Sequence, residues 1–196
     1  MTDVVLIHHV QGLTDGVLAF ADGLREGGHV VHTPDIFRGE RPATIDDGLR
    51  LTQELGDAEI GDRLTRQIVD LPSDVVWAGI SYGVSMAQLL AQTQPGARGA
   101  LLYAACIPVT GEWAFGPWPK GVPVQIHGKD QDPFFAGEGD LDAAKQLVET
   151  VGPELGQLYV YPGEEHLYLD SSLPDYDAAA TALTLERSLE LLARVR

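Results

Sequence analysis

The sequence predicts an α/β protein in which helices cover both faces of a mostly parallel, six-stranded sheet. Apolar runs of strand length alternate with longer segments whose apolar residues recur at helical spacing. The runs are apolar almost throughout, which is typical of strands buried on both faces. Most connections are short, as expected when parallel strands are joined through helices. We therefore expect three layers and the strand order 2-1-3-4-5-6.

Each expected strand is an apolar run with Gly, Pro or polar residues at its ends. Pro34, for example, stops the second run. The six runs cover residues 3–8, 29–33, 75–80, 99–104, 122–127 and 157–161.

The expected helices share an amphipathic pattern and recognisable ends. Thr14 or Asp15 caps the first helix and Gly27-Gly28 ends it, while Pro95-Gly96 ends the fourth. The second and third show the least regular spacing. The six helical segments cover residues 15–26, 44–57, 60–69, 81–94, 140–151 and 176–195.

Composition excludes several classes of function. The 196 residues suffice for one well-buried core, so we expect a single domain, 1–196. A formal net charge of −16 opposes binding to nucleic acid or anionic membranes. No stretch resembles a membrane span or a signal peptide, and the single cysteine, Cys106, is expected to be a buried hydrophobe. We expect a cytoplasmic protein with a small-molecule partner, either monomeric or homodimeric.

Ser81 is the candidate nucleophile. It is the centre of Gly79-Ile80-Ser81-Tyr82-Gly83, which follows an apolar strand and opens a helix. Glycines on either side allow the sharp turn that lifts a serine clear of the sheet. The N–H of Tyr82 would then point at an oxyanion beside Ser81. The alternative is an ordinary glycine-containing turn.

The loop after the first strand, residues 9–12, supplies a second candidate donor. In the expected strand order, ligands bind where the order reverses, between strands one and three. Val10 is the first choice for the second oxyanion N–H. His9 and Gln11 are candidates for contact with the substrate.

A base and an acid follow two other strands. A serine nucleophile needs a base, usually histidine, oriented by a carboxylate. His166 follows strand six and Asp132 follows strand five, and both loops leave the sheet at the same edge. Asp130 is the alternative acid. A lone histidine or aspartate is more often structural, so the joint placement carries the interpretation. No histidine pair has zinc-ligand spacing, and no cofactor is expected.

A long loop, residues 108–121, and the segment after Asp132 bring aromatic residues to the same edge of the sheet. Trp113, Trp118 and Phe134 are the candidates for a confined apolar pocket above Ser81. Their alternative role is to close the core beneath the loop.

The chain resembles the dienelactone hydrolase family of α/β-hydrolases along nearly its whole length. The resemblance rests on the serine elbow, on Gly128 to Asp132, on Tyr161 to His166 and on the segment from Gly28 to Asp35. It implies the α/β-hydrolase fold and hydrolase activity. Because Pro and an aromatic follow Asp132, the resemblance favours Asp132 over Asp130. Ser81 and His9 stand where the dienelactone-cleaving members carry cysteine and glutamate.

These observations predict a serine hydrolase that cleaves a small ester, lactone or thioester through an acyl-enzyme intermediate. Ser81, His166 and Asp132 would form the triad, and the N–H groups of Val10 and Tyr82 the oxyanion hole. The alternative is a non-catalytic small-molecule-binding protein that keeps the fold.

Overall fold

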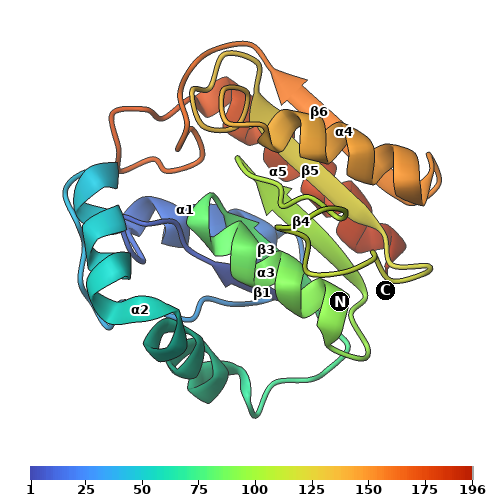
Figure 1. Ribbon diagram of the computed structural model, residues 1–196, viewed down its shortest axis with the longest axis horizontal. Coiled ribbons are helices and arrows are strands. Elements are labelled where there is room, and N and C mark those ends of the chain that lie inside the picture. Colours follow the sequence, from blue (N-terminus) through green and yellow to red (C-terminus); the bar gives the residue numbers. More distant parts are fainter. Residues whose placement is uncertain (196) are drawn as a thin grey trace.

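A parallel six-stranded sheet forms the centre of the computed structural model, which describes residues 1–195 (Figure 1). The strand order is β2-β1-β3-β4-β5-β6, and all five pairings are parallel, which confirms the predicted sheet. The strands are β1 (Asp3–Ile7), β2 (Val30–His32), β3 (Val76–Ile80), β4 (Gly99–Tyr103), β5 (Val124–Lys129) and β6 (Gly156–Tyr161).

Helices cover both faces of this sheet. Helices α1 and α5 pack on one face and α2, α3 and α4 on the other; in Figure 1, α3 lies in front of the sheet and α5 behind it. This is the predicted three-layer architecture. The helices are α1 (Asp15–Glu26), α2 (Ile45–Ile68), α3 (Tyr82–Thr93), α4 (Asp140–Val151) and α5 (Ala178–Arg194).

Two apolar clusters, one on each face, hold the layers together. Every residue of β3 and β4 is buried, so both strands contribute side chains to both clusters. Burying one Val, Leu or Ile side chain stabilises a fold by about 1.5–3 kcal/mol. An exposed ion pair contributes only about 0–1 kcal/mol. The apolar clusters therefore contribute more than the surface ion pairs to the stability of the three layers.

The two helical segments expected at 44–57 and 60–69 are both present within α2. They meet at Gly56, whose non-helical backbone (φ 75°, ψ 154°) puts a kink between them. One expected boundary was wrong. Strand β5 starts at Val124, two residues later than expected, and continues to Lys129.

No helix joins the neighbouring parallel strands β4 and β5 in the described chain. The connection is the long loop from Pro108 to Gly121, which must return from the carboxyl edge of the sheet to its amino edge. Trp118, only 9% exposed, packs in the apolar cluster on that face, and its Nε1 donates to the carbonyl of Val122 at 2.8 Å. Gln92 of α3 donates to Gly116 at 2.6 Å. The loop therefore fills space that a crossover helix would otherwise cover.

None of the helices described here is both long and apolar enough to cross a lipid bilayer.

A buried histidine makes the stability of the fold depend on pH. His127 in β5 is fully buried, with ring nitrogens 2.9 Å from the Tyr161 hydroxyl and 2.8 Å from Gln125 Oε1. Burial, with a further contribution from Arg187, lowers the pKa of His127 to about 3. The folded protein therefore keeps this ring neutral under conditions in which an exposed histidine is charged.

We expect His127→Gln to flatten the acid side of the stability profile. The unfolded chain binds a proton at His127 below about pH 6.5, whereas the folded protein does so only near pH 3, so protonation favours unfolding between these values. Within that window the residue contributes a slope of about 1.4 kcal/mol per pH unit. Urea unfolding at several pH values measures it. Parallel profiles for the parent and the variant would contradict the assignment.

Candidate active site

The turn between β3 and α3 holds Ser81 in a strained backbone conformation. Its φ of 50° and ψ of −115° lie in a region that residues other than glycine rarely adopt. The N–H of Ser81 donates to the carbonyl of Tyr103 at 2.7 Å, which ties the turn to the end of β4. The side chain consequently stands at the carboxyl edge of the sheet, at the N-terminus of α3.

Gly79 and Gly83 make this turn possible. A Cβ on Gly79 would lie 2.4 Å from the carbonyl oxygen of Gly83, and a Cβ on Gly83 would lie 2.3 Å from that of Ile7. Both obstacles are backbone atoms, which cannot rotate away as side chains can. The N-terminus of α3 can therefore approach β1 and β3 this closely only with glycine at both positions.

Ser81, His166 and Asp132 form a continuous chain of hydrogen bonds. Ser81 Oγ lies 2.7 Å from His166 Nε2, and His166 Nδ1 lies 2.7 Å from Asp132 Oδ2. The other carboxylate oxygen of Asp132 accepts the N–H of Phe134 at 2.9 Å. Because an ionised carboxylate only accepts, Nδ1 of His166 carries the proton. Nε2 of the neutral ring is then free to accept the proton of Ser81.

Asp130, the alternative acid, lies in a different contact. Its Oδ1 accepts the N–H of Gly163 at 3.0 Å, and Gln131 donates its N–H to the carbonyl of Gly163 at 3.0 Å. These bonds join the loop that carries Asp132 to the loop that carries His166. The structure therefore places Asp132, and not Asp130, against the imidazole.

Sequence reasoning missed Lys129, which braces the same two loops. It is 1% exposed, and its Nζ lies 2.5 Å from Glu165 and 2.7 Å from Asp177, the N-cap of α5. Burial alone would lower the pKa of Lys129, but its hydrogen bonds to Asp177 and Glu165 outweigh burial and raise it. The sequence did contain a signal for this contact. A lysine ends an otherwise apolar strand, and acidic residues follow the next strand.

The two backbone N–H groups predicted for the oxyanion hole have no acceptor among residues 1–195. Tyr82 is the first residue of α3, so its N–H has no acceptor within the helix. The N–H of Val10 makes no hydrogen bond in the described chain either. The carbonyl of His9 accepts from Gly12 at 3.0 Å and lies 2.7 Å from His8 Nδ1. In a trans peptide the N–H of Val10 points away from the carbonyl of His9. The two contacts of that carbonyl therefore fix the direction of the Val10 N–H.

His9 and Gln11, expected to contact the substrate, are both buried and make hydrogen bonds within the protein. The ring of His9 is completely buried, with Nε2 2.9 Å from Asp170 and Nδ1 accepting the N–H of Gln11 at 3.2 Å. Burial lowers the pKa of His9, although Asp170 opposes that effect. The amide nitrogen of Gln11 donates to the carbonyl of Ala43 at 3.0 Å. These groups brace the loop formed by residues 9–12, and both ring nitrogens of His9 are occupied within the protein.

A pocket of about 260 Å³ opens beside Ser81 and His166. Phe134 lines it as expected, with its ring centroid 4.6 Å from that of His166. Sequence reasoning did not anticipate the polar residues Ser85, Glu138 and Asp140, although the start of the helix after strand five had to lie at this edge. The lining residues are Ser81, Tyr82, Ser85, Ala104, Ala105, Ile107, Phe134, Glu138, Asp140 and His166.

Trp113 and Trp118 do not line this pocket, which corrects the predicted aromatic cover. Trp113 is 77% exposed, and Trp118 lies in the core. The reason is the path of their loop, which runs back along α3 to the amino edge of β5 and carries Trp118 away from Ser81.

Comparison with known proteins identifies the family. The model of the dienelactone hydrolase family matches residues 1–196. The chain belongs to the dienelactone hydrolase family. It is therefore a hydrolase with the α/β-hydrolase fold, as the sequence predicted. No curated protein matches the sequence of this chain.

Solved structures share the fold at low sequence identity. A candidate dienelactone hydrolase from Klebsiella pneumoniae has a TM-score of 0.76 and 15% identity, over 99% of this chain and 87% of that one. A dienelactone hydrolase-like promiscuous phosphotriesterase from metagenomic libraries has a TM-score of 0.73 and 15% identity, over 100% and 87%. A propionate-bound esterase from Thermogutta terrifontis has a TM-score of 0.61 and 16% identity, over 99% and 83%.

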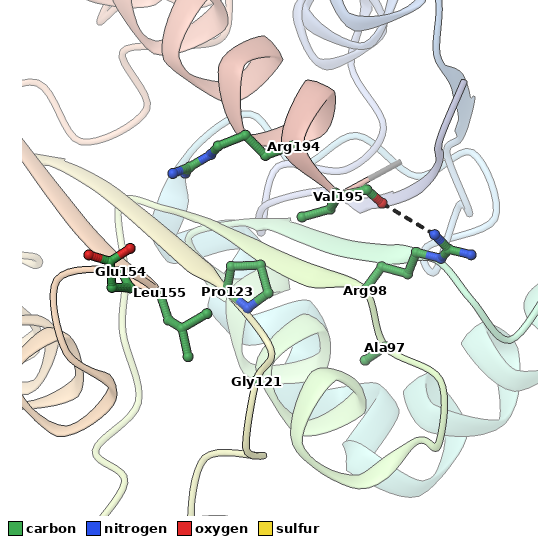
Figure 2. Close-up of a pocket in the computed structure, with 8 residues that line it drawn as sticks. All are labelled: Ala97, Arg98, Gly121, Pro123, Glu154, Leu155, Arg194 and Val195. Atoms are coloured by element: carbon green, nitrogen blue, oxygen red, sulfur yellow. Dashed lines mark hydrogen bonds between the residues drawn. The ribbon is translucent and has the colours of Figure 1, made fainter.

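A second pocket, larger than the one beside Ser81, lies at the amino edge of the sheet in this member of the dienelactone hydrolase family. Figure 2 shows its lining, where Arg98 donates to the carbonyl of Val195 at 3.5 Å and Pro123 leads into β5. Its volume is about 520 Å³. Its charged lining residues are Arg98, Glu154 and Arg194, and none of them is a nucleophile with an adjacent base. Size therefore does not identify the reactive site in this protein.

We expect alanine to have opposite effects at two glycines. Gly83→Ala should lower the free energy of unfolding by about 1–3 kcal/mol or more, because the new methyl meets the backbone of β1. Gly61→Ala, inside α2 with open space around its Cβ position, should raise it by about 0.5–1 kcal/mol. Urea unfolding measures both. Equal effects at the two sites would refute the close-approach argument.

Proposed function

We propose that this hydrolase cleaves a small carboxylic ester, lactone or thioester through an acyl-enzyme intermediate on Ser81. The observation that carries the proposal is the pair of 2.7 Å contacts that links Ser81 through His166 to Asp132 at the head of a pocket. A binding protein that only kept the fold would not need a strained serine in contact with a base. The proposal therefore takes precedence over the non-catalytic alternative.

The first half of the reaction acylates Ser81. Oγ attacks the substrate carbonyl carbon and forms a new C–O bond, while its proton passes to Nε2 of His166. The carbonyl π electrons move onto oxygen, and the N–H groups of Val10 and Tyr82 donate to this oxyanion. The positive end of the α3 dipole stabilises the same charge. Asp132 orients the ring and stabilises the imidazolium.

Departure of the leaving group completes this first half. The oxyanion electrons re-form the carbonyl as the bond between carbonyl carbon and leaving group breaks, and His166 gives its proton to the departing alcohol, hydroxyl or thiol. In the second half, water attacks the acyl-enzyme and loses a proton to His166. Collapse of the second tetrahedral intermediate returns that proton to Ser81 and frees the carboxylic acid. Protons and electrons balance without a cofactor.

Ser81→Ala and His166→Ala should each reduce kcat by about 10⁴-fold or more. The double variant should be little worse, because the two side chains act as a unit. Asp132→Asn should cost less than either, while Asp130→Asn should cost much less again, because Asp130 only joins two loops. Steady-state hydrolysis of an activated acetate ester measures these effects.

Labelling by a fluorophosphonate probe provides the control for folding and reactivity. The parent protein should be labelled at Ser81, and the Ser81→Ala variant should not. If the folded parent resists labelling while a control hydrolase reacts, the binding-protein alternative is preferred. A crippling Asp130→Asn beside a benign Asp132→Asn would overturn the assignment of the acid.

The pocket volume predicts a preference for short acyl groups. Its walls include Phe134 and Ile107, and about 260 Å³ leaves little room for a long chain. We expect kcat/KM to fall as the acyl group grows beyond a few carbons. Phe134→Ala should relax this limit by roughly 1–3 kcal/mol in activation free energy. Trp113→Ala, which changes an exposed residue, is the matched control and should leave the dependence of kcat/KM on acyl length unchanged. Equal rates for short and long acyl esters in the parent would refute the confined pocket.

A further inference from the structure

Two carboxyl side chains line the pocket beside Ser81, and neither is paired with a lysine or arginine among residues 1–195. Glu138 and Asp140 line it, and its lining includes no lysine or arginine. Asp140 makes no ion pair among residues 1–195, and His166 is the basic group that acts on it most strongly, while Glu138 and Asp132 act in the opposite sense. Buried Lys129, by contrast, is paired with both Glu165 and Asp177. The acidic lining of the pocket is thus an exception that calls for an explanation.

Packing accounts for one oxygen of Asp140 only. Asp140 begins α4, where the helix dipole favours a carboxylate, and its Oδ2 accepts the N–H of Cys106 at 3.0 Å. The half-buried carboxyl group has a raised pKa because of burial, with a smaller contribution from Glu138, and the Cys106 N–H opposes both. Glu138 is exposed at the pocket and makes no side-chain hydrogen bond in the described chain. A cation between the two carboxylates would relieve their unfavourable interaction.

Aromatic rings complete the lining around these carboxylates. Phe134 lies against His166, and half-buried Tyr82 lies at the start of α3. The faces of such rings attract ammonium groups, and alkylated ammonium ions bind where aromatic rings and carboxylates occur together. The same surroundings repel an anion, since both the rings and the carboxylates present negative potential.

We propose that the preferred substrate is an ester or lactone with a positively charged ammonium group on the part that enters this pocket. The inference rests on the proposed function of Ser81 and names the substrate class of that site. Glu138 and Asp140 select the substrate by attracting its cation, with Phe134 and Tyr82 in contact with the alkyl groups on nitrogen. Esters that carry a carboxylate at the same place are disfavoured.

The test compares esters that differ in charge but hardly in shape. Acetylcholine, its uncharged carbon isostere dimethylbutyl acetate and an acetate ester of equal length ending in a carboxylate form one series. A second series places the same charges in the acyl group, because the pocket can accept either side of the ester. Each kcat/KM is divided by the alkaline hydrolysis rate of that ester. In at least one series the cation should exceed the neutral ester by about tenfold, and the anion should be slowest.

Charge variants locate the effect. Glu138→Gln should reduce the cation-to-anion ratio of kcat/KM roughly threefold or more, and Asp140→Asn should reduce it as well, with thermal unfolding showing that each variant is folded. Glu154→Gln is the matched control, because it removes the same charge at the opposite edge of the sheet. The ratio should stay unchanged in that variant. Equal ratios in Glu138→Gln and Glu154→Gln would show that only the net charge of the protein acts, and would overturn the proposal.

Binding without turnover separates this proposal from that of the reaction. Tetramethylammonium should raise the melting temperature of Ser81→Ala more than the uncharged neopentyl alcohol does, and Glu138→Gln in that background should remove the difference. If the probe labels Ser81 and the enzyme hydrolyses neutral esters without preferring cationic ones, only the proposed substrate class is refuted. A protein that binds the cation and hydrolyses no ester refutes the proposed function.

Discussion

The close approach of α3 to β1 and β3 is the constraint on which the site depends. It needs glycine at positions 79 and 83, because a Cβ at either would meet backbone oxygen or carbon at less than 3 Å. The approach forces Ser81 into a positive φ and aims the start of α3 at the space above the sheet. One packing contact thus sets the serine, the N–H of Tyr82 and the helix dipole together.

The other parts of the site come from loops, and buried polar contacts hold these loops in place. Asp130 joins the aspartate loop to the histidine loop through Gly163, and Lys129 pulls the histidine loop towards α5. His9 joins the loop of residues 9–12 to Asp170, four residues after His166. Each contact links segments that follow different strands. Catalysis needs side chains placed within a fraction of an ångström. Contacts of this kind hold the loops at that precision, which the loop backbone alone does not provide.

In the described chain a loop, and not a crossover helix, connects β4 to β5, and this connection shapes the pocket. The loop sends Trp118 into the core at the amino side of the sheet, so the wide aromatic cover expected from the sequence does not form. Small residues at the end of β4, Ala104 and Ala105, line the pocket instead. Ala104 has a φ of 60°, a second strained residue beside Ser81. The pocket beside Ser81 is therefore small, at about 260 Å³, and two of its lining residues, Glu138 and Asp140, are acidic.

The sequence by itself determined the strands, the serine elbow and the loops that carry Asp132 and His166. These features are local, because apolar runs, glycine spacing and helix ends are encoded in neighbouring residues. The strand order was predictable because the alternation of strands and helices leaves few topologies. Only the tertiary structure decided which aspartate meets His166, that His9 and Gln11 brace a loop, and that Trp118 fills the core while Glu138 and Asp140 face Ser81. Those outcomes depend on contacts between segments far apart in the chain, where the direction and burial of a side chain are set by packing that no local pattern contains.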